Sequence, residues 1–182
     1  MGKTVLVPLA KGSEEMEAVI IIDILRRAGL NVIVTGENDI ITCSRGVKII
    51  PDILISDIEN DTLFDAIVIP GGAFGTSNLI KNQTLEEMLI QHAKKNKIIG
   101  AICAAPTILA EKKILPEGTQ ITSHPSVKKQ LEHLNYSEND VVISDNFVTS
   151  RGAGTAIKFA LIIVEMLQGT EVSAKISKDI VY

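Results

Sequence analysis

The stretch Ile98-Ile99-Gly100-Ala101-Ile102-Cys103-Ala104-Ala105-Pro106 is the most informative part of this 182-residue sequence. Its first five residues are apolar and predict a buried strand. Pro106 is typical of the first turn of a helix. Cys103 therefore stands at a sharp strand-to-helix turn, which needs the small glycine and alanine neighbours that surround it. This pattern predicts a nucleophile elbow, although the usual G-x-S-x-G spelling is absent.

Short β-rich segments and helical segments alternate on both sides of this stretch. Strand–helix alternation at this spacing predicts an α/β fold, with a mostly parallel sheet covered by helices on both faces. We expect strands at 3–9, 31–35, 66–69, 98–102, 120–123 and within 141–149, helices at 13–28, 84–95, from about 106 and at 153–167, and a hairpin at 40–50 that turns at Gly46.

The composition supports this fold class. Hydrophobic residues make up 46% of the chain, yet only 3% is aromatic and Trp is absent. The core must then consist of Ile, Val, Leu and Ala, which favours buried parallel strands. A chain of this length fits a single domain, expected to span residues 1–182.

Charge and cysteine content exclude several classes of protein. The net charge is −4 and no basic stripe is present, so we expect no specific nucleic-acid binding. Two cysteines make no disulfide framework and fit a reducing compartment. No apolar run approaches ~18 residues, and the N-terminal apolar stretch is too short for a signal peptide. We therefore expect a cytoplasmic protein that does not enter membranes.

Cys103 is the strongest candidate for a reactive group. A thiol at a helix N-terminus meets free N–H groups and the positive end of the helix dipole, which lower its pKa below the ordinary ~8.5. We therefore predict an acidic nucleophile here, whereas Cys43, in the predicted hairpin, has no such surroundings. The alternative is that Cys103 is an inert cysteine in an apolar strand.

Glu17 is the candidate acid partner. Positions 17, 21, 24 and 28 share one face of the first helix, and the other three are apolar, so Glu17 is expected to point inward and Glu15 toward water. Burial raises the pKa of a carboxyl group. A neutral Glu17 can donate a hydrogen bond to a thiolate and later move a proton. The alternative is that the acidic residues of this turn only complement the helix dipole.

Three further positions carry weaker signals. Gly71 and Gly72 follow a predicted strand and can offer N–H groups to an oxyanion, or simply form a turn. His124 follows another strand and is either a base for Cys103 or a cap. Arg151 opens the last long helix and is a candidate for an anion site. His92 is expected to be a packing residue. No cluster has metal-ligand spacing, so no metal is predicted.

Taken together, several segments resemble the ThiJ/PfpI superfamily, and specifically its Parkinson-disease protein branch of glyoxalases and deglycases. The resemblance covers essentially the whole chain. The segments that carry it are Gly12-Ser13-Glu14-Glu15-Met16-Glu17-Ala18, Thr42-Cys43-Ser44-Arg45-Gly46, Pro70-Gly71-Gly72, Ala101-Ile102-Cys103-Ala104-Ala105-Pro106-Thr107, Ser123-His124-Pro125 and Thr149-Ser150-Arg151-Gly152.

The resemblance implies a flavodoxin-like three-layer sandwich, a single class I glutamine amidotransferase-like domain and a homodimer. It also implies a role for each candidate residue. Cys103 is the nucleophile, Glu17 is its protonated partner, and His124 lies nearby as a further catalytic candidate. The amides of Gly72 and Ala104 form an oxyanion hole, and the substrate pocket near the dimer interface contains Gly71, Arg45 and Arg151.

The implied activity needs no cofactor. Members of the branch are credited with converting methylglyoxal or glyoxal to 2-hydroxy acids and with deglycating aldehyde adducts on proteins and nucleotides. The alternative is a redox-sensing or chaperone-like regulatory protein in which oxidation of Cys103 controls partner binding. Peptidase-like relatives place a His directly after the nucleophile, and amidotransferases use G-x-C-x-G with a later His-x-Glu. Ala104 follows Cys103 here and both amidotransferase motifs are missing, which disfavours those two activities.

Overall fold

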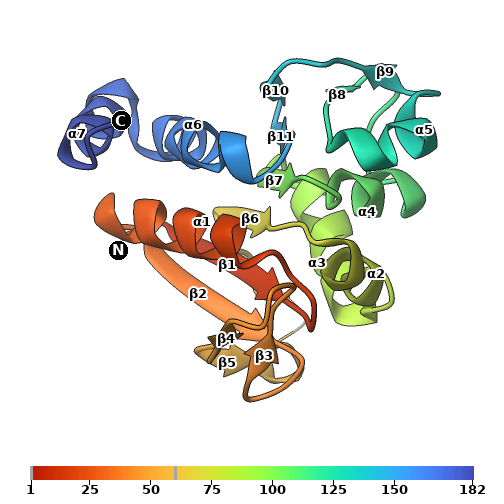
Figure 1. The fold of residues 1–182 in the computed structure, drawn as a ribbon, viewed down its shortest axis with the longest axis horizontal. Coiled ribbons are helices and arrows are strands. Elements are labelled where there is room, and N and C mark those ends of the chain that lie inside the picture. The colour runs from red at the N-terminus through yellow and green to blue at the C-terminus, as the bar shows by residue number, and fades with distance from the viewer. Residues whose placement is uncertain (1, 60) are drawn as a thin grey trace.

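A seven-stranded sheet runs through the centre of the molecule (Figure 1). The computed structural model describes residues 2–59 and 61–182. The strand order is β10-β11-β7-β6-β1-β2-β5, and every neighbouring pair is parallel except β10 with β11. The strands are β1 (Thr4–Leu9), β2 (Asn31–Gly36), β5 (Ile53–Leu54), β6 (Ala66–Ile69), β7 (Ile98–Ile102), β10 (Val141–Ser144) and β11 (Phe147–Ser150), with small separate pairs β3 (Ile41–Thr42) with β4 (Lys48–Ile49) and β8 (Gln120–Ile121) with β9 (Asn135–Tyr136).

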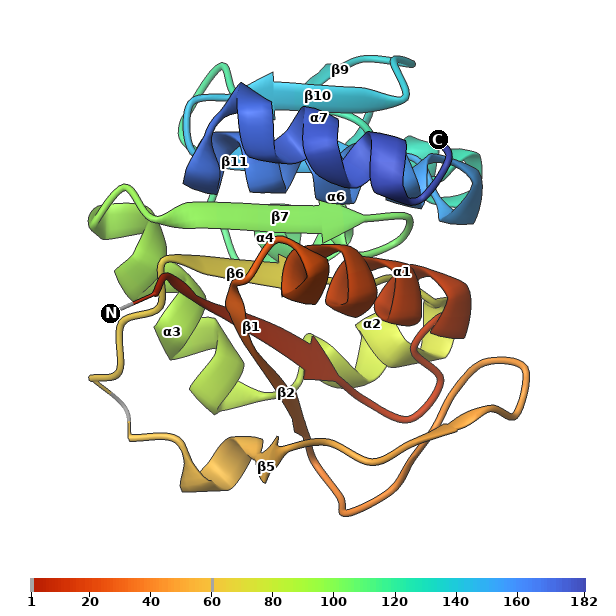
Figure 2. The ribbon, with the colours of Figure 1, turned by 90° about the vertical axis from the view of Figure 1, so that its left-hand side faces the viewer.

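Helices cover both faces of this sheet. In Figure 2, α1, α6 and α7 lie in front of the strands, while α3 and α4 lie behind them. The mostly parallel, flavodoxin-like α/β fold that the sequence predicts is thereby confirmed. The helices are α1 (Glu15–Arg27), α2 (Ala73–Leu79), α3 (Gln83–Lys94), α4 (Pro106–Glu111), α5 (Lys128–Leu131), α6 (Ala156–Gln168) and α7 (Thr170–Asp179), with 3-10 turns η1 (Ile55–Asp57), η2 (Pro125–Val127) and η3 (Ala153–Thr155).

The two faces of the sheet build two separate cores. Successive strand residues point to opposite faces, so Val5 and Val7 pack against α1 and α6, whereas Leu6 packs with α3 and α4. All three side chains are fully buried. This two-sided burial explains why the central strands are continuous apolar runs rather than alternating ones.

The hairpin at residues 40–50 corrects one expectation. It forms as predicted, with β3 antiparallel to β4 and Gly46 at φ +90°. It also lies over the start of α1, where the Glu15 carboxylate accepts a hydrogen bond from Ser44 Oγ (2.6 Å) and another from the Arg45 N–H (2.7 Å). The expectation that Glu15 points to water is therefore wrong: Glu15 is only 6% exposed. Helical periodicity shows which residues share a face of α1, but it cannot show that a hairpin distant in sequence covers Glu15 on the opposite face.

Candidate active site

Cys103 occupies the sharp turn between β7 and α4, as the sequence predicts. Its φ is +64°, in the left-handed region that residues with side chains rarely adopt,. The backbone is held on both sides, because the Cys103 N–H donates to the Ser150 carbonyl (2.9 Å) and its carbonyl accepts from the His124 N–H (2.8 Å). Such a conformation costs about 1–3 kcal/mol and persists only where the surroundings enforce it.

Glu17 lies directly beside this turn. Its side chain is buried, with 1% exposure. One carboxyl oxygen, Oε2, accepts a hydrogen bond from the Gly71 N–H at 2.7 Å, and the carboxyl group is also hydrogen-bonded to the Cys103 thiol. The structure thus brings together the two residues that the sequence selected, although they come from different strand ends.

Glu14 positions Glu17, and this contribution was missed in the sequence. The Glu14 carboxylate is the N-cap of α1 and accepts from the Glu17 N–H at 2.7 Å. Its own N–H donates to the Gly71 carbonyl at 2.9 Å. Glu14 therefore ties the first turn of α1 to the loop after β6. A carboxylate at the N-cap position is the signal that could have revealed this.

Gly71 has no room for a side chain. A Cβ atom there would lie 2.5 Å from Cys103 Cβ and 2.9 Å from Glu17 Oε2. The close approach allows the Gly71 amide to reach the carboxyl group of Glu17. Gly71 thus acts on Glu17, whereas the sequence had suggested an amide for the substrate.

Two other amides face the sulfur atom. The N–H groups of Gly72 and Ala104 both donate hydrogen bonds to Cys103 Sγ. Gly72 has φ +92°, and a Cβ atom on it would lie 2.4 Å from the Gly12 carbonyl oxygen. These are the amides that the resemblance assigned to an oxyanion hole. The arrangement can hold a negative charge on the sulfur or on an atom bonded to it.

The pKa of Glu17 is raised to about 7. Burial is the main cause, and the hydrogen bonds from Gly71 and Cys103 act in the opposite direction. Each pKa unit corresponds to about 1.4 kcal/mol between the two protonation states. A carboxyl group with this pKa is substantially protonated at neutral pH, as the sequence predicts.

The thiol behaves differently from the prediction. Burial and then the ionised Glu17 raise the pKa of Cys103 to about 12, against the lowering effect of the Gly72 and Ala104 amides. A helix N-terminus alone therefore does not make this thiol acidic. Because the two groups are in contact, they titrate as a coupled pair, and one proton remains for both groups once the first has been lost. The thiolate forms when that proton resides on Glu17, which removes the repelling charge.

His124 lies at the edge of this arrangement, with its side chain exposed. Its Nδ1 lies 2.8 Å from Ser126 Oγ and accepts from the Ser126 N–H at 3.2 Å. Gly152 separates the ring from Glu17, since a Cβ atom on Gly152 would lie 3.4 Å from His124 Cδ2 and 3.9 Å from Glu17 Oε1. The side-chain contacts of His124 fit a cap, while its backbone holds Cys103.

Arg45 and Arg151 use their guanidinium groups locally. Arg45 is exposed and donates to the Ser44 carbonyl at 3.3 Å. Arg151 is half-buried and donates to the Glu138 carbonyl at 3.0 Å. A guanidinium group has five N–H donors, so both side chains keep donors for an anion beside these backbone contacts.

The site lies at one end of the sheet. Glu17 follows β1, Gly71 follows β6, Cys103 follows β7 and Gly152 follows β11. These four strands are parallel neighbours, so their carboxyl ends meet at the same edge. This is the edge where sheets of this type bind ligands.

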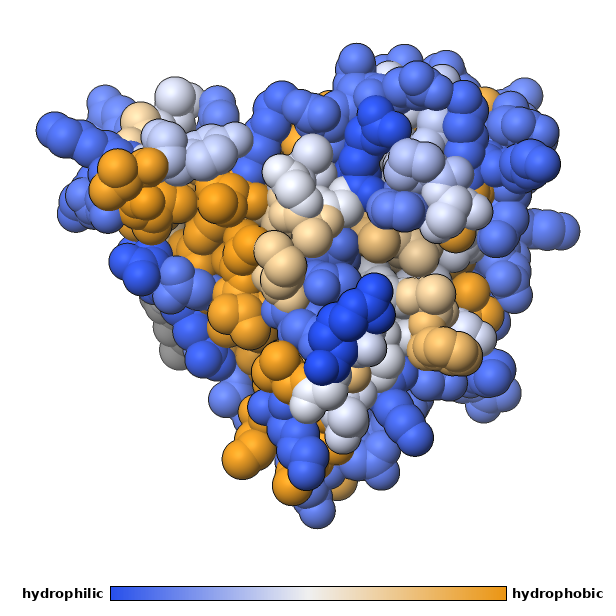
Figure 3. All heavy atoms as spheres, viewed as in Figure 1, coloured by the Kyte–Doolittle hydropathy of each residue, from blue (hydrophilic) through white to orange (hydrophobic). Residues whose placement is uncertain are grey.

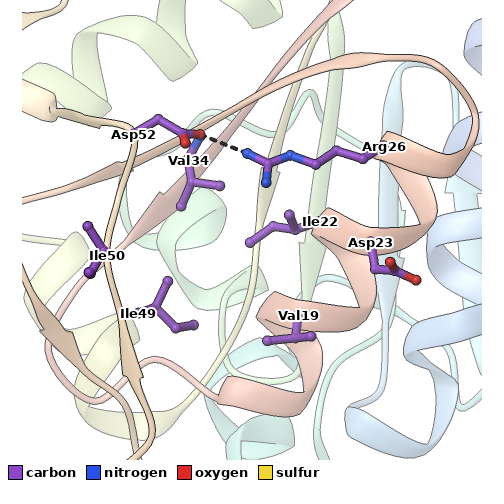
Figure 4. A pocket seen from close by; sticks show the side chains of 8 residues that line it. All are labelled: Val19, Ile22, Asp23, Arg26, Val34, Ile49, Ile50 and Asp52. Atoms are coloured by element: carbon purple, nitrogen blue, oxygen red, sulfur yellow. Dashed lines mark hydrogen bonds and ion pairs between the residues drawn. The ribbon is translucent and has the colours of Figure 1, made fainter.

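A separate hollow of about 260 Å³ lies between α1 and the segment around β4 and β5 (Figure 4). Val19, Ile49 and Ile50 line it, and Arg26 pairs with Asp52 across it at 2.9 Å. Figure 3 shows hydrophobic side chains gathered along α1 and continuing toward the β3–β4 hairpin. Met16, Val19 and Ile50 are 57%, 51% and 76% exposed, so this face is unusually apolar for solvent contact.

Neither a membrane span nor a metal cluster is found in the part of the chain that the structure describes. No helix within 2–59 and 61–182 is long and apolar enough to cross a bilayer. Over the same residues, no group of three or more His, Cys, Asp or Glu side chains is placed to hold a metal ion.

Comparison with known proteins identifies the family. The model of the DJ-1/PfpI family matches residues 3–166. This chain belongs to the DJ-1/PfpI family. Parkinson disease protein 7 homolog of Danio rerio is 41% identical over 185 residues, which cover 99% of this chain and 97% of that protein. Glutathione-independent glyoxalase DJR-1.2 of Caenorhabditis elegans is 40% identical over 171 residues, covering 92% of this chain and 90% of that protein.

Solved structures of DJ-1/PfpI proteins agree with this fold. The crystal structure of Drosophila melanogaster DJ-1beta superposes with a TM-score of 0.95 at 41% identity, covering 100% of this chain and 98% of that one. The fold described above is therefore shared with that structure over the whole chain.

Proposed function

We propose that this protein is a glutathione-independent glyoxalase that converts 2-oxoaldehydes to 2-hydroxy acids through Cys103. One observation carries the proposal: the buried Glu17 carboxyl group faces the Cys103 thiol while two amides point at the sulfur. The name of the Caenorhabditis elegans relative, a glutathione-independent glyoxalase, supports this activity.

The first step uses both groups of the pair. Cys103 passes its proton to Glu17, and the thiolate sulfur attacks the aldehyde carbon of methylglyoxal. A C–S bond forms, and the carbonyl π pair moves to oxygen. The amides of Gly72 and Ala104 stabilise this oxyanion, which then takes the proton from Glu17 to give a hemithioacetal.

The second step is an internal redox exchange. The Glu17 carboxylate removes the proton from the former aldehyde carbon, giving an enediolate, and returns it to the neighbouring carbon, while the hydroxyl proton of the former aldehyde carbon moves to the oxygen of the former ketone. The aldehyde carbon is oxidised to a thioester and the ketone carbon is reduced to an alcohol. Water then cleaves the thioester, releases lactate and restores the Cys103 thiol, so no external oxidant or reductant is needed.

Lactate formation from methylglyoxal by the purified protein, without glutathione, tests this function. We expect turnover by the wild-type chain and by Cys43→Ser, and none by Cys103→Ser. Cys43 is a suitable control because it is buried in the hairpin, and burial, then Glu15 and Glu14, raise its pKa to about 11. Equal activity of the wild type and Cys103→Ser would contradict the proposal.

A redox-sensing role is the second candidate, and the same geometry favours it. A sulfinate on Cys103 would accept hydrogen bonds from a protonated Glu17 and from the two amides. After mild treatment with hydrogen peroxide, mass spectrometry should find two added oxygen atoms on the peptide that contains Cys103. Oxidation confined to the Cys43 peptide would exclude this role for the site.

The surroundings of the site extend the proposal. We infer that the exposed apolar face along α1 is covered by a second copy of this chain. Contacts of Arg45 and Arg151 with the substrate, a catalytic part for His124 and a cytoplasmic location belong to the same proposal. A reducing compartment would keep the Cys103 thiol available for attack.

A further inference from the structure

The segment 136–140, which we call the strap, connects the two residues that hold the backbone of Cys103. The Cys103 carbonyl accepts from the His124 N–H at 2.8 Å, and the Cys103 N–H donates to the Ser150 carbonyl at 2.9 Å. These two hydrogen bonds enforce the positive φ of the turn, so the residues that make them must themselves be held in place. The strap runs from the end of β9 to the start of β10 (Figure 1) and bonds to the chain beside both of them.

The Ser150 end of the strap is fixed to the central sheet. Ser150 is the last residue of β11, which is parallel to β7, and its side chain is fully buried. Ser150 Oγ donates to the Asp140 carbonyl at 2.8 Å, and the Arg151 N–H donates to the same carbonyl at 3.2 Å. The strap is therefore anchored to the central sheet through Asp140.

The His124 end has no such support from the central sheet. The strand that leads to it, β8, pairs with β9 in a separate two-stranded sheet. The Thr122 N–H donates to Thr149 Oγ1 at 2.9 Å and ties the segment to β11 at that point. Ser123 and His124 follow this contact, before the 3-10 turn η2. The position of the His124 N–H therefore depends on what holds Ser123.

Tyr136, at the beginning of the strap, holds Ser123. Its Oη donates to the Ser123 carbonyl at 3.2 Å and lies 3.3 Å from Ser123 Oγ. Because Ser123 is fully buried, water is a poor substitute for this donor. The neighbouring Ser137 N–H donates to the Ile121 carbonyl at 2.7 Å, which fixes the strap next to Tyr136. The hydroxyl of Tyr136 thus carries the anchoring of the strap to the segment that contains His124.

We propose that Tyr136 is a positioning residue for Cys103. The strap is anchored through Asp140, so the Tyr136 hydroxyl holds Ser123 in place. This aims the His124 N–H at the Cys103 carbonyl and keeps the strained turn from relaxing. When the turn relaxes, the thiol moves away from its carboxyl partner and from the oxyanion amides. The inference deepens the proposed function, and its effect on turnover rests on that function.

Tyr136→Phe tests the proposal, because it removes the hydroxyl and keeps the ring, whose centroid lies 5.6 Å from Lys128 Nζ. We expect kcat for methylglyoxal to fall about 3- to 10-fold, the effect of one lost hydrogen bond. KM should stay within about 2-fold, since the groups that meet the substrate are unchanged. Tyr182→Phe is the matched control: it removes the same atom from a side chain that is 62% exposed and should change neither constant. A Tyr136→Phe protein with the kcat of the wild type would overturn the proposal.

Amide hydrogen exchange measured by NMR separates positioning from a general loss of stability and needs no turnover. In Tyr136→Phe, exchange of the His124 N–H should accelerate about 3- to 10-fold more than that of the slowest amides of β1 and β6, which open only on global unfolding. An acceleration at His124 no greater than in those strands, with a lower melting temperature, would contradict the proposal. If exchange at His124 responds as expected but the wild-type chain forms no lactate, the positioning by Tyr136 stands and the glyoxalase function fails.

Discussion

At the scale of single residues, one shared proton determines whether Cys103 or Glu17 carries the negative charge. Burial disfavours charge on either group, and contact between them disfavours charge on both,. An isolated thiol in this position would have to lose its proton to bulk water. The neighbouring Glu17 carboxyl gives that proton a local site, which is what the proposed reaction requires at every step.

Glu17→Gln tests this use of the proton. The amide keeps the shape and can still face the sulfur, but it cannot accept and return a proton. We expect turnover of methylglyoxal to fall by roughly 10²–10⁴, with the melting temperature nearly unchanged. Steady-state kinetics and thermal melts of the same preparation measure both. If Glu17 served only the helix dipole, Gln would lower stability slightly and leave turnover close to that of the wild type.

At the scale of elements, the close contact between the β6–α2 loop and the β7–α4 turn limits what can stand at position 71. Gly71→Ala places a methyl group against Cys103 Cβ and Glu17 Oε2. We expect about 1–3 kcal/mol of destabilisation and a loss of turnover larger than the loss of stability explains. Gly154→Ala is the control, because a Cβ atom on Gly154 would meet no other atom within 4 Å. Full activity in Gly71→Ala would show that Cys103 and Glu17 need not be so close.

His92 makes α3 sensitive to acid. It is fully buried, its Nε2 accepts from the Phe64 N–H at 2.9 Å, and its Nδ1 lies 2.6 Å from the Met88 carbonyl oxygen. Burial lowers the pKa of His92. The imidazole of His92 therefore binds a proton more readily in the unfolded chain than in the folded one. Its contribution to stability is complete above the ordinary histidine pKa near ~6.5 and is lost as the pH falls below that value.

Urea unfolding between pH 7 and pH 5 measures this effect. Glu17 titrates in the same pH range, but its effect on stability has the opposite sign. Because its pKa is raised, its contribution to stability is complete below the ordinary pKa of a glutamate and is lost as the pH rises through about 7,. The comparison is therefore between the wild type and His92→Gln, both of which contain Glu17. We expect the unfolding free energy of the wild type to fall more on acidification than that of the variant. Parallel pH profiles would show that His92 does not contribute.

Sequence patterns predicted β1, β2, β6 and β7 to within one residue at each end, because buried parallel strands are unbroken apolar runs,. The two-residue edge strand β5 was not predicted. Among the described residues, three helices were not predicted: α2, the short α5 and α7. The α2 sequence begins Ala73-Phe74-Gly75-Thr76 and has weak helix formers; Gly75 fits there because its missing side chain lets the backbone of Ser13 approach. In α7 only Ser173 and Ile176 are buried, which leaves little periodicity to detect.

The candidate site was predictable in its residues but not in its energetics. Cys103 and Glu17 stand out because Cys103 follows an apolar strand at a sharp turn and Glu17 is a carboxylate on the apolar face of α1. The pKa of the thiol was predicted in the wrong direction, because helix position was visible in the sequence and burial against a carboxylate was not. Glu15 shows the same limit, since its partners Ser44 and Arg45 come from a hairpin almost thirty residues away.

At the scale of the whole molecule, the apolar face along α1 leads us to expect a homodimer. Light scattering after gel filtration should give the wild type a molar mass twice the 19.6 kDa of one chain. Val19→Asp should shift it to the monomer, because Val19 is 51% exposed on that face. Ile143→Asp is the control, at 53% exposure on the edge strand β10. A dimer that survives Val19→Asp would place the interface elsewhere.

The site also draws on four parallel strands that span the chain from Thr4 to Ser150. Contacts across the site join distant parts of the chain: Glu17 and Gly71 are 54 positions apart, and Cys103 is held by Ser150. Contacts at such separations form late and slowly during folding. A chain emerging from denaturant should regain helical signal well before it can bind or turn over aldehyde. Partly folded chains would thus carry an exposed Cys103 thiol without Glu17 beside it. In those chains Cys103 is open to non-specific oxidation, whereas in the folded chain the surrounding residues limit access to the thiol.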